Sequence, residues 1–310
     1  MIDPMDVLTL FPVRKSRKQK ERFQAAVRTY AEKLGYQVKI EPGGFGVRNI
    51  VIGNPECAEY LITAHYDTCA ALPFPNLITP CSLLLLLGWQ LILVLVLCVP
   101  VGILGGLVGY ALNNSDLAVF AAYVLLLAEV AMMLVGPANR QNANDNTSGV
   151  VAVLETARAL PRELRDRACF VLFDLEEAGL LGSASYRKTH RKQTERQIVL
   201  NLDCVGEGDE ILLFPTKKSK KRQEQMTLLR SCCKTSGRKS LSLREKGFSI
   251  YPSDQGNFPF GVGIAAFCRS KWAGLYLARI HTAKDRILDE NNVALLWDFL
   301  ITVVAERKKG

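Results

Sequence analysis

The sequence lacks charge over one long stretch. From Thr68 to Ser115, 48 consecutive residues include no Asp, Glu, Lys, Arg or His. Within and beyond this stretch, Leu83–Leu112 and Leu117–Gly136 are apolar almost throughout, and a run of about 20 apolar residues is long enough to cross a bilayer. We therefore predict a transmembrane helical hairpin over residues 83–136, inserted between two parts of one domain. A very apolar helix pair buried inside a soluble protein is the alternative.

Other features are missing as well. The nine Cys follow no regular spacing and include no CxxC pair, which favours free thiols in a reducing compartment. No apolar core follows the basic residues 14–18, so we expect no secretory signal. The net charge of +9 comes without a nucleic-acid-binding motif, so we expect no nucleic-acid partner. The oligomeric state is not predictable from the sequence.

Basic residues are unevenly distributed around the hairpin. Residues 1–20 are rich in Lys and Arg and are expected to form a flexible basic arm, whereas the turn at 113–116 has neither residue. The positive-inside rule then places both termini and the part of the chain outside the hairpin in the cytoplasm. We also expect the arm and the basic run Lys217–Arg222 to contact anionic headgroups, although a plain solvated loop is a close alternative.

Two polar side chains interrupt the hairpin. Gln90 lies about eight residues into the first helix, and Glu129 lies at a similar depth in the second, at the helical rise of about 1.5 Å per residue. A hydrogen bond between them would lower the cost of a carboxyl group in lipid. We therefore predict that Gln90 and Glu129 pair. The alternative is that Glu129 faces a neighbouring chain or a water-filled cleft.

Outside the hairpin, short apolar strands alternate with amphipathic helices. This order is typical of an α/β protein, and we predict a three-layer sandwich with a mixed, mostly parallel central sheet. One catalytic domain would comprise residues 21–80 and 137–310, with the hairpin at 81–136. The expected strands are 38–40, 49–52, 60–64, 168–175, 198–202, 210–214, 248–251, 264–268 and 274–278, and the expected helices are 21–34, 148–160, 181–190, 223–234 and 291–307.

Polar residues gather where the expected strands end. His65 and Asp67 follow one buried strand, the Glu176-Glu177 pair follows a second, and Asp203 follows a third. Sites in α/β proteins form at the carboxyl ends of strands, and buried carboxylates are costly without partners. Together with the loop residues Asp145 and His281, they make a donor set suited to divalent zinc.

The residue types suggest separate tasks. One Asp can bridge two metal ions through its two oxygens, and Asp145 is the only charged residue of its segment. Adjacent side chains point in different directions, so one of Glu176 and Glu177 can bind metal while the other acts as a general base. Asp67 is close enough in sequence to orient the imidazole of His65. The remaining histidine, His190, lies on a basic helical surface and is read as structural.

Five ordered motifs resemble those of the di-zinc exopeptidases, a family that includes bacterial leucine aminopeptidases, glutamate carboxypeptidase and the glutaminyl cyclases. They are His65-Tyr66-Asp67-Thr68, the Asn144–Gly149 segment, Glu176–Ser183, Asn201-Leu202-Asp203 and the late His281. The segment at Ser253-Asp254 is similar as well. The resemblance covers nearly the whole chain outside the hairpin and the arm. The hairpin departs from the family pattern, and because His65 and Asp145 flank it, the site is expected close to the lipid surface.

The resemblance implies a role for each matching residue. Two zinc ions per chain would be bound, one by His65 and Asp203, the other by Glu177 and His281, with Asp145 between them. Glu176 would be the general base, Asp67 would orient His65, and Tyr251 could stabilise the oxyanion.

The function that follows from the resemblance is a membrane-anchored zinc aminopeptidase acting on short peptides. A glutaminyl-cyclase-like single-zinc acyltransferase and a catalytically idle membrane scaffold are the alternatives.

Overall fold

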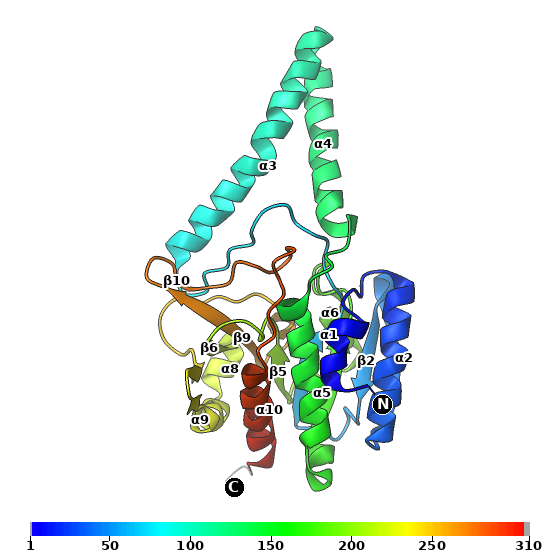
Figure 1. The fold of residues 1–310 in the computed structure, drawn as a ribbon, viewed down its shortest axis with the longest axis vertical. Helices are drawn as coiled ribbons and strands as arrows, with labels where there is room; N and C mark the ends of the chain where they lie inside the picture. Colours follow the sequence, from blue (N-terminus) through cyan, green and yellow to red (C-terminus); the bar gives the residue numbers. More distant parts are fainter. Residues whose placement is uncertain (1, 307–310) are drawn as a thin grey trace.

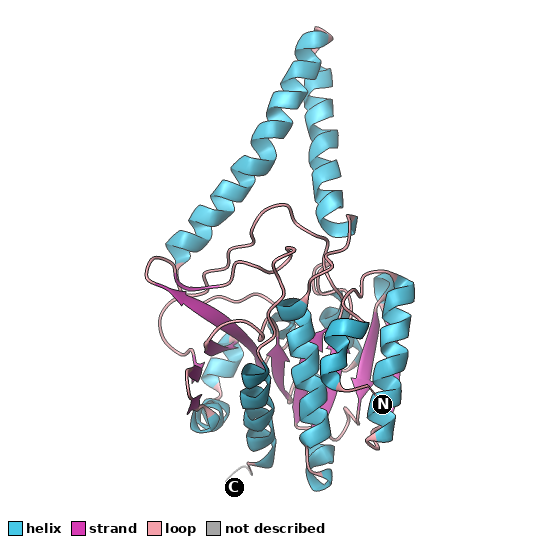
Figure 2. Ribbon diagram, in the orientation of Figure 1, coloured by secondary structure: helices cyan, strands magenta, loops and turns pink. Residues whose placement is uncertain are grey.

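The computed structural model describes residues 2–306 and shows one large mixed sheet flanked by helices, with a long hairpin projecting from it (Figures 1 and 2). The strand order is β1-β2-β4-β3-β5-β9-β6-β8-β7, with β10 paired to β9. The strands are β1 (Val38–Pro42), β2 (Arg48–Ile52), β3 (Tyr60–His65), β4 (Ala168–Phe173), β5 (Ile198–Leu202), β6 (Glu210–Pro215), β7 (Thr235–Ser236), β8 (Lys239–Leu243), β9 (Gly261–Ser270) and β10 (Gly274–Tyr276).

The centre of the sheet is parallel. Strands β4, β3, β5 and β9 pair in parallel, while β2 on one side runs antiparallel to β4 and β6 on the other side runs antiparallel to β9. Every residue of β3, β4 and β5 is buried, as expected for strands covered on both faces. The predicted α/β class with a mixed sheet is confirmed, and the parallel part lies at the centre of that sheet. The sheet is not mostly parallel, because four of the strand pairs in the described residues are parallel and five are antiparallel.

Helices cover both faces of the sheet. Side chains from α2, α5, α9 and α10 share one core with the strand residues that point to that face, such as Ile62. The neighbouring residue Leu61 points to the opposite face and packs with Tyr186 of α6, because successive strand side chains alternate. The helices outside the hairpin are α1 (Val7–Leu10), α2 (Arg17–Lys33), α5 (Gly149–Ala159), α6 (Leu181–Thr189), α7 (Arg191–Thr194), α8 (Lys217–Lys221), α9 (Gln223–Cys232) and α10 (Glu290–Ala305).

The hairpin consists of α3 (Leu83–Ala111) and α4 (Ser115–Val135), and both helices are long and apolar enough to span a membrane. They meet close to their connecting turn, where a side chain at Gly105 or Gly109 would overlap Ala118 or Ala122. Small residues permit such close backbone approach. From this crossing the two helices diverge towards the sheet (Figure 1).

The predicted pairing of Gln90 with Glu129 is wrong. Within residues 2–306 no hydrogen bond joins them: Gln90 is exposed, and Oε2 of Glu129 is buried without a partner. The reason is the crossing at Gly105 and Gly109, which brings the helices together near the turn, whereas they lie apart towards the sheet (Figure 1). Equal depth in two helices did not ensure contact.

The N-terminal segment is packed rather than a flexible arm. Residues 4–10 form a short 3-10 turn and α1, and Val7 is fully buried in the core. Lys20 makes a buried ion pair with Asp174, with Nζ and Oδ1 2.6 Å apart. Lys15 donates from Nζ to the carbonyl of Leu134 at the end of α4. The segment therefore links the base of the hairpin to the domain.

One expected strand is absent, because the segment Phe248–Tyr251 forms no strand. Most of the basic run Lys217–Arg222 forms the short helix α8 after β6, whose last residue, Pro215, pairs with Val262 near the amino end of β9. The run therefore follows β6 at the amino end of β9, and its expected contact with headgroups stays a prediction. The other expected strands and helices are present with shifted ends; Arg307, the last expected residue of the closing helix, lies outside the described residues.

Candidate metal centre

The parallel strands bring the predicted ligands to one edge of the sheet. His65 is the last residue of β3, Glu177 follows β4, and Asp203 directly follows β5. Because β3 pairs in parallel with both other strands, their carboxyl ends meet at this edge. Asp145 comes from the segment between α4 and α5, and His281 from the loop between β10 and α10.

Asp145 lies between the two histidines. Its Oδ1 is 3.2 Å from Nε2 of His65, and its Oδ2 is 2.9 Å from Nε2 of His281. Each imidazole nitrogen also faces a second carboxylate: His65 is 3.5 Å from Oδ1 of Asp203, and His281 is 3.2 Å from Oε2 of Glu177. The cluster therefore consists of two groups of three side chains that share Asp145.

The electrostatics of the cluster fit metal binding. Burial lowers the pKa of His281, but the carboxylates of Glu177 and Asp145 outweigh it and raise that pKa to about 10. Burial raises the pKa of Glu177 to about 8. The pKa of Asp145 is lowered, because the two histidines outweigh its burial. Oε1 of Glu177 is buried without a hydrogen-bond partner. The imidazoles satisfy the buried carboxylates only in part, since one oxygen of Glu177 has no partner. A divalent cation such as zinc binds to both kinds of donor and would balance the remaining negative charge.

Asp67 connects three parts of the site. Its main-chain oxygen lies 3.2 Å from Nδ1 of His65, and its Oδ1 lies 3.5 Å from the same nitrogen. The Asp67 carboxylate also accepts the backbone N–H groups of Glu176 and Glu177, at 3.1 and 3.3 Å. The orienting role of Asp67 stays a prediction, and its link to the Glu pair was not foreseen.

Glu176 belongs to a further group of close donor atoms, which it forms with His65 and Glu177 and which does not include Asp145. Burial raises the pKa of Glu176 well above the ordinary value although the charge of His65 opposes this, and the nearby carboxylates of Asp203 and Glu177 raise that pKa further. A carboxylate with a raised pKa beside a metal site is suited to accept a proton near neutral pH. Its role as general base stays a prediction.

Tyr251 is buried behind the site. Its hydroxyl donates to the main-chain oxygen of Asp203 at 3.3 Å, and its ring stacks on Phe214. This contact would help to hold the Asp203 loop. The oxyanion role of Tyr251 stays a prediction. His190, read as structural, pairs with Glu41, with Nε2 and Oε2 2.8 Å apart.

Asp285 is a site residue that sequence reasoning missed. Its two carboxylate oxygens accept the backbone N–H groups of Asn144 and Asp145, at 2.7 and 3.0 Å. The side chain of Asn146 bonds the carbonyl of Leu202 at the end of β5. Asp285 and Asn146 thus hold the Asp145 backbone from both sides. The sequence feature that could have indicated this role is the position of Asp285, four residues after the predicted ligand His281.

Arg14 was also missed, and it is fully buried. Its Nε donates to the carbonyl of Tyr66 at 2.5 Å, and its guanidinium lies 3.1 Å from Oγ1 of Thr147. Its backbone N–H donates to Oγ1 of Thr68 at 3.0 Å. Tyr66 and Thr68 follow His65, and Thr147 follows Asp145. Arg14 therefore ties together the two loops that carry these candidate ligands.

Replacing Arg14 by Met is expected to destabilise the protein by about 3 kcal/mol, because the buried carbonyl of Tyr66 loses a charged donor. Zinc content should fall as well, since the loops bearing His65 and Asp145 lose their link. Thermal unfolding in detergent and zinc analysis measure both effects. Arg17→Met, at a side chain 81% exposed, is the control. Unchanged stability in Arg14→Met would contradict the role given to Arg14.

The metal-free protein is expected to lose stability as pH rises from about 4 to about 7. Burial raises the pKa of Asp254 and of Asp285 to about 7, from an ordinary value of 3.8. In this window the folded state keeps protons that the unfolded state releases, so stability falls with rising pH. Thermal unfolding of chelator-treated protein at both ends of the window tests this. A midpoint that rises with pH would contradict it.

The sheet and the histidine–carboxylate cluster at its carboxyl edge are those of a zinc metallopeptidase. The model of peptidase family M28 matches residues 121–303, which is 183 of the 310 residues. The chain therefore belongs to peptidase family M28. Aminopeptidase YwaD of Bacillus subtilis is 40% identical over 67 residues, a match that spans 21% of this chain and 15% of that protein. The chain thus matches a small part of this curated relative.

Solved structures share the fold across nearly the whole chain. A glutaminyl cyclase of Porphyromonas gingivalis has a TM-score of 0.60 at 15% identity, covering 97% of this chain and 96% of its own. A Zn-dependent exopeptidase of Parabacteroides distasonis has a TM-score of 0.59 at 14% sequence identity, and the match covers 98% of this chain and 97% of that protein. The LapA aminopeptidase of Legionella pneumophila has a TM-score of 0.58 at 14% sequence identity, and the match covers 99% of this chain and 69% of that protein. These likenesses bear on fold alone.

Proposed function

We propose that this chain is a membrane-anchored zinc aminopeptidase that hydrolyses N-terminal residues of short peptides. The observation that carries the proposal is the placement of Asp145, whose two oxygens face Nε2 of His65 and Nε2 of His281 at 3.2 and 2.9 Å. A carboxylate with one imidazole at each of its oxygens could bind one metal ion on each side, which supports a bridged metal pair. His65, Asp145 and Asp203 would hold one zinc, and Asp145, Glu177 and His281 the other.

Bound zinc supplies Lewis acidity, which polarises the scissile carbonyl and makes water easier to deprotonate. The remaining steps belong to the protein's side chains. Glu176 accepts the proton of the attacking water and delivers it to the leaving amine. Asp67 holds the tautomer of His65 through Nδ1 and fixes the backbone of Glu176. Asp285 holds the backbone of Asp145.

Amide hydrolysis is to be distinguished from glutaminyl cyclisation, because the fold is similar to enzymes of both kinds. The test offers the detergent-purified, zinc-loaded protein two substrates, an aminoacyl amide and a peptide beginning with glutamine. Release of the free amino acid supports the proposal. Ammonia release with a pyroglutamyl product would replace it with a cyclase. Turnover of neither, with zinc bound, would favour a membrane scaffold.

We also propose that α3 and α4 insert in the bilayer, with residues 21–80 and 137–310 forming the catalytic domain on the cytoplasmic side. The apolar surfaces of both helices and the buried packing of the basic N-terminal segment against the domain support this. Alkaline carbonate extraction tests insertion, and protease protection in sealed vesicles tests the side. Release of the chain by carbonate would remove the membrane proposal and leave the peptidase proposal intact.

A further inference from the structure

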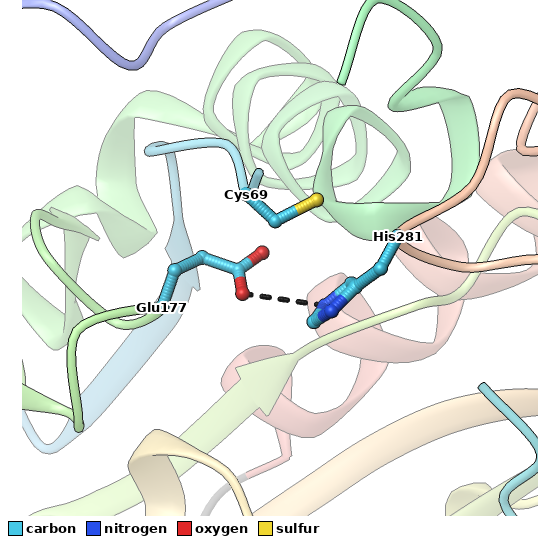
Figure 3. Close-up of side chains that lie close together, drawn as sticks. All are labelled: Cys69, Glu177 and His281. Atoms are coloured by element: carbon cyan, nitrogen blue, oxygen red, sulfur yellow. Dashed lines mark ion pairs between the residues drawn. The ribbon is translucent and has the colours of Figure 1, made fainter. Parts of the chain in front are cut away.

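Cys69 lies beside the ligands of one proposed metal position. Its Sγ, a nitrogen of His281 and a carboxylate oxygen of Glu177 all lie within 4.8 Å of one another. Figure 3 shows the side chain of Cys69 next to the ion pair between Glu177 and His281. Cys69 is 4% exposed, so this sulfur faces the protein interior. Within residues 2–306, Cys69 is the one cysteine that belongs to such a group of donors.

The backbone around Cys69 is fixed on both sides. Its carbonyl accepts the N–H of Asn139 at 3.1 Å, and Ala70 pairs with Ala138 in an isolated β-bridge. The N–H of Leu72 donates to the carbonyl of His281 at 2.8 Å. The segment that leads into the hairpin is therefore hydrogen-bonded to the loop carrying His281. Cys69 is held next to this histidine by main-chain contacts, which do not depend on a side-chain rotamer.

A second observation is that donor atoms around Cys69 lack hydrogen-bond partners. Oε1 of Glu177 is buried and has no hydrogen bond within the described residues. The thiol of Cys69 has one weak contact, to Oδ1 of Asn142 at 3.7 Å. A buried carboxylate oxygen without a donor and a thiol with a single long contact can both be satisfied by one cation between them.

We infer that Cys69 is a thiolate ligand of the metal held by Glu177 and His281. This inference rests on the proposed metal pair and adds a sulfur donor to it. Cys69, Glu177 and His281 form one group of three close donors. Asp145, whose Oδ2 lies 2.9 Å from Nε2 of His281, would be the fourth protein donor, and four is the number found in tetrahedral zinc sites. The thiol proton is released to solvent when the metal binds.

The sulfur donor makes the two positions different. The metal between His65 and Asp203 has three protein ligands and keeps a place for water or substrate, as catalytic zinc does. The metal beside Cys69 would have the sulfur as an additional protein ligand and would be held more tightly. A soft thiolate also favours zinc, cobalt or cadmium over manganese or magnesium. The protein should therefore accept manganese at one position more readily than at the other.

The test is the absorption spectrum of the full-length protein after zinc is replaced by cobalt(II). Thiolate bound to cobalt gives a charge-transfer band in the near ultraviolet, whereas the visible bands report bound cobalt whatever the ligands. We expect the near-ultraviolet band in the unaltered protein and its loss in Cys69→Ser and Cys69→Ala, with visible bands retained. The matched control is Cys204→Ala, because Cys204 is also buried and its Sγ lies 3.2 Å from Asp203. This control should keep the band.

Each other outcome has a defined meaning. Visible bands without the near-ultraviolet band would overturn the role of Cys69 and leave the proposed function standing. Loss of the band in Cys204→Ala alone would overturn it as well. Failure to bind cobalt or zinc at all would remove the proposed function. If the Cys69 variants do not fold, zinc X-ray absorption of the unaltered protein decides: a sulfur neighbour at about 2.3 Å supports the inference, and nitrogen and oxygen neighbours alone overturn it.

Discussion

Glu176→Gln is expected to reduce peptide turnover by about 10²–10⁴-fold while zinc content stays unchanged. The amide has nearly the shape of the carboxylate, but it cannot accept the proton of the attacking water. Glu176 is not among the ligands assigned to either metal, and its backbone N–H stays bonded to Asp67. Steady-state kinetics and elemental analysis of the same preparation measure both quantities.

Glu163→Gln is the matched control for this change, because Glu163 is exposed on the short turn before β4. Its turnover should equal that of the unaltered protein. Turnover retained in Glu176→Gln would remove Glu176 from the base role. A loss of zinc together with turnover would instead make Glu176 a ligand, in agreement with its closeness to His65 and Glu177.

Asp145→Ala is expected to lower the zinc content from about two per chain towards none, because both proposed positions share this carboxylate. Its removal also leaves His65 and His281 without the oxygens that now lie 3.2 and 2.9 Å away. Activity should fall to background with the metals. Elemental mass spectrometry on detergent-purified protein gives the stoichiometry, and Asp166→Ala, at an exposed position, is the control.

The starting value is informative on its own. About one zinc in the unaltered protein would favour the single-zinc cyclase-like alternative, and none after zinc is offered would favour a scaffold. A content that stays near two in Asp145→Ala would contradict the bridging role. A content of one would mean that one group of ligands is sufficient without the shared carboxylate.

The sequence predicted those parts of the site that follow from strand periodicity. A buried parallel strand is an apolar run with a sharp end, so His65, Glu177 and Asp203 could be assigned to one edge of the sheet. The structure brings them together with Asp145 and His281. The sheet class follows from the same alternation of strands and helices.

The parts that could not be predicted depend on contacts between distant segments. Arg14 occurs in a basic stretch that has the composition of a solvated arm, and its burial follows from partners 52 and 133 positions away. Asp285 acts through backbone N–H groups 140 residues upstream, which leave no side-chain signal. The predicted pairing of Gln90 with Glu129 was wrong for a related reason. The depth of a residue along a helix can be counted from the sequence, but the point where two helices cross cannot.

The hairpin separates the site along the chain. His65, Asp67 and Cys69 are synthesised before α3, and every other residue of the cluster follows α4. A ribosome must therefore complete both apolar helices before the first pair of ligands can meet. Under the proposed topology, membrane insertion precedes assembly of the centre, and a chain stalled before insertion carries an incomplete and inert set of ligands. If the proposed topology holds, the placement of the hairpin would set the order of biogenesis, and zinc loading and peptidase activity would begin only after the helices have reached the bilayer.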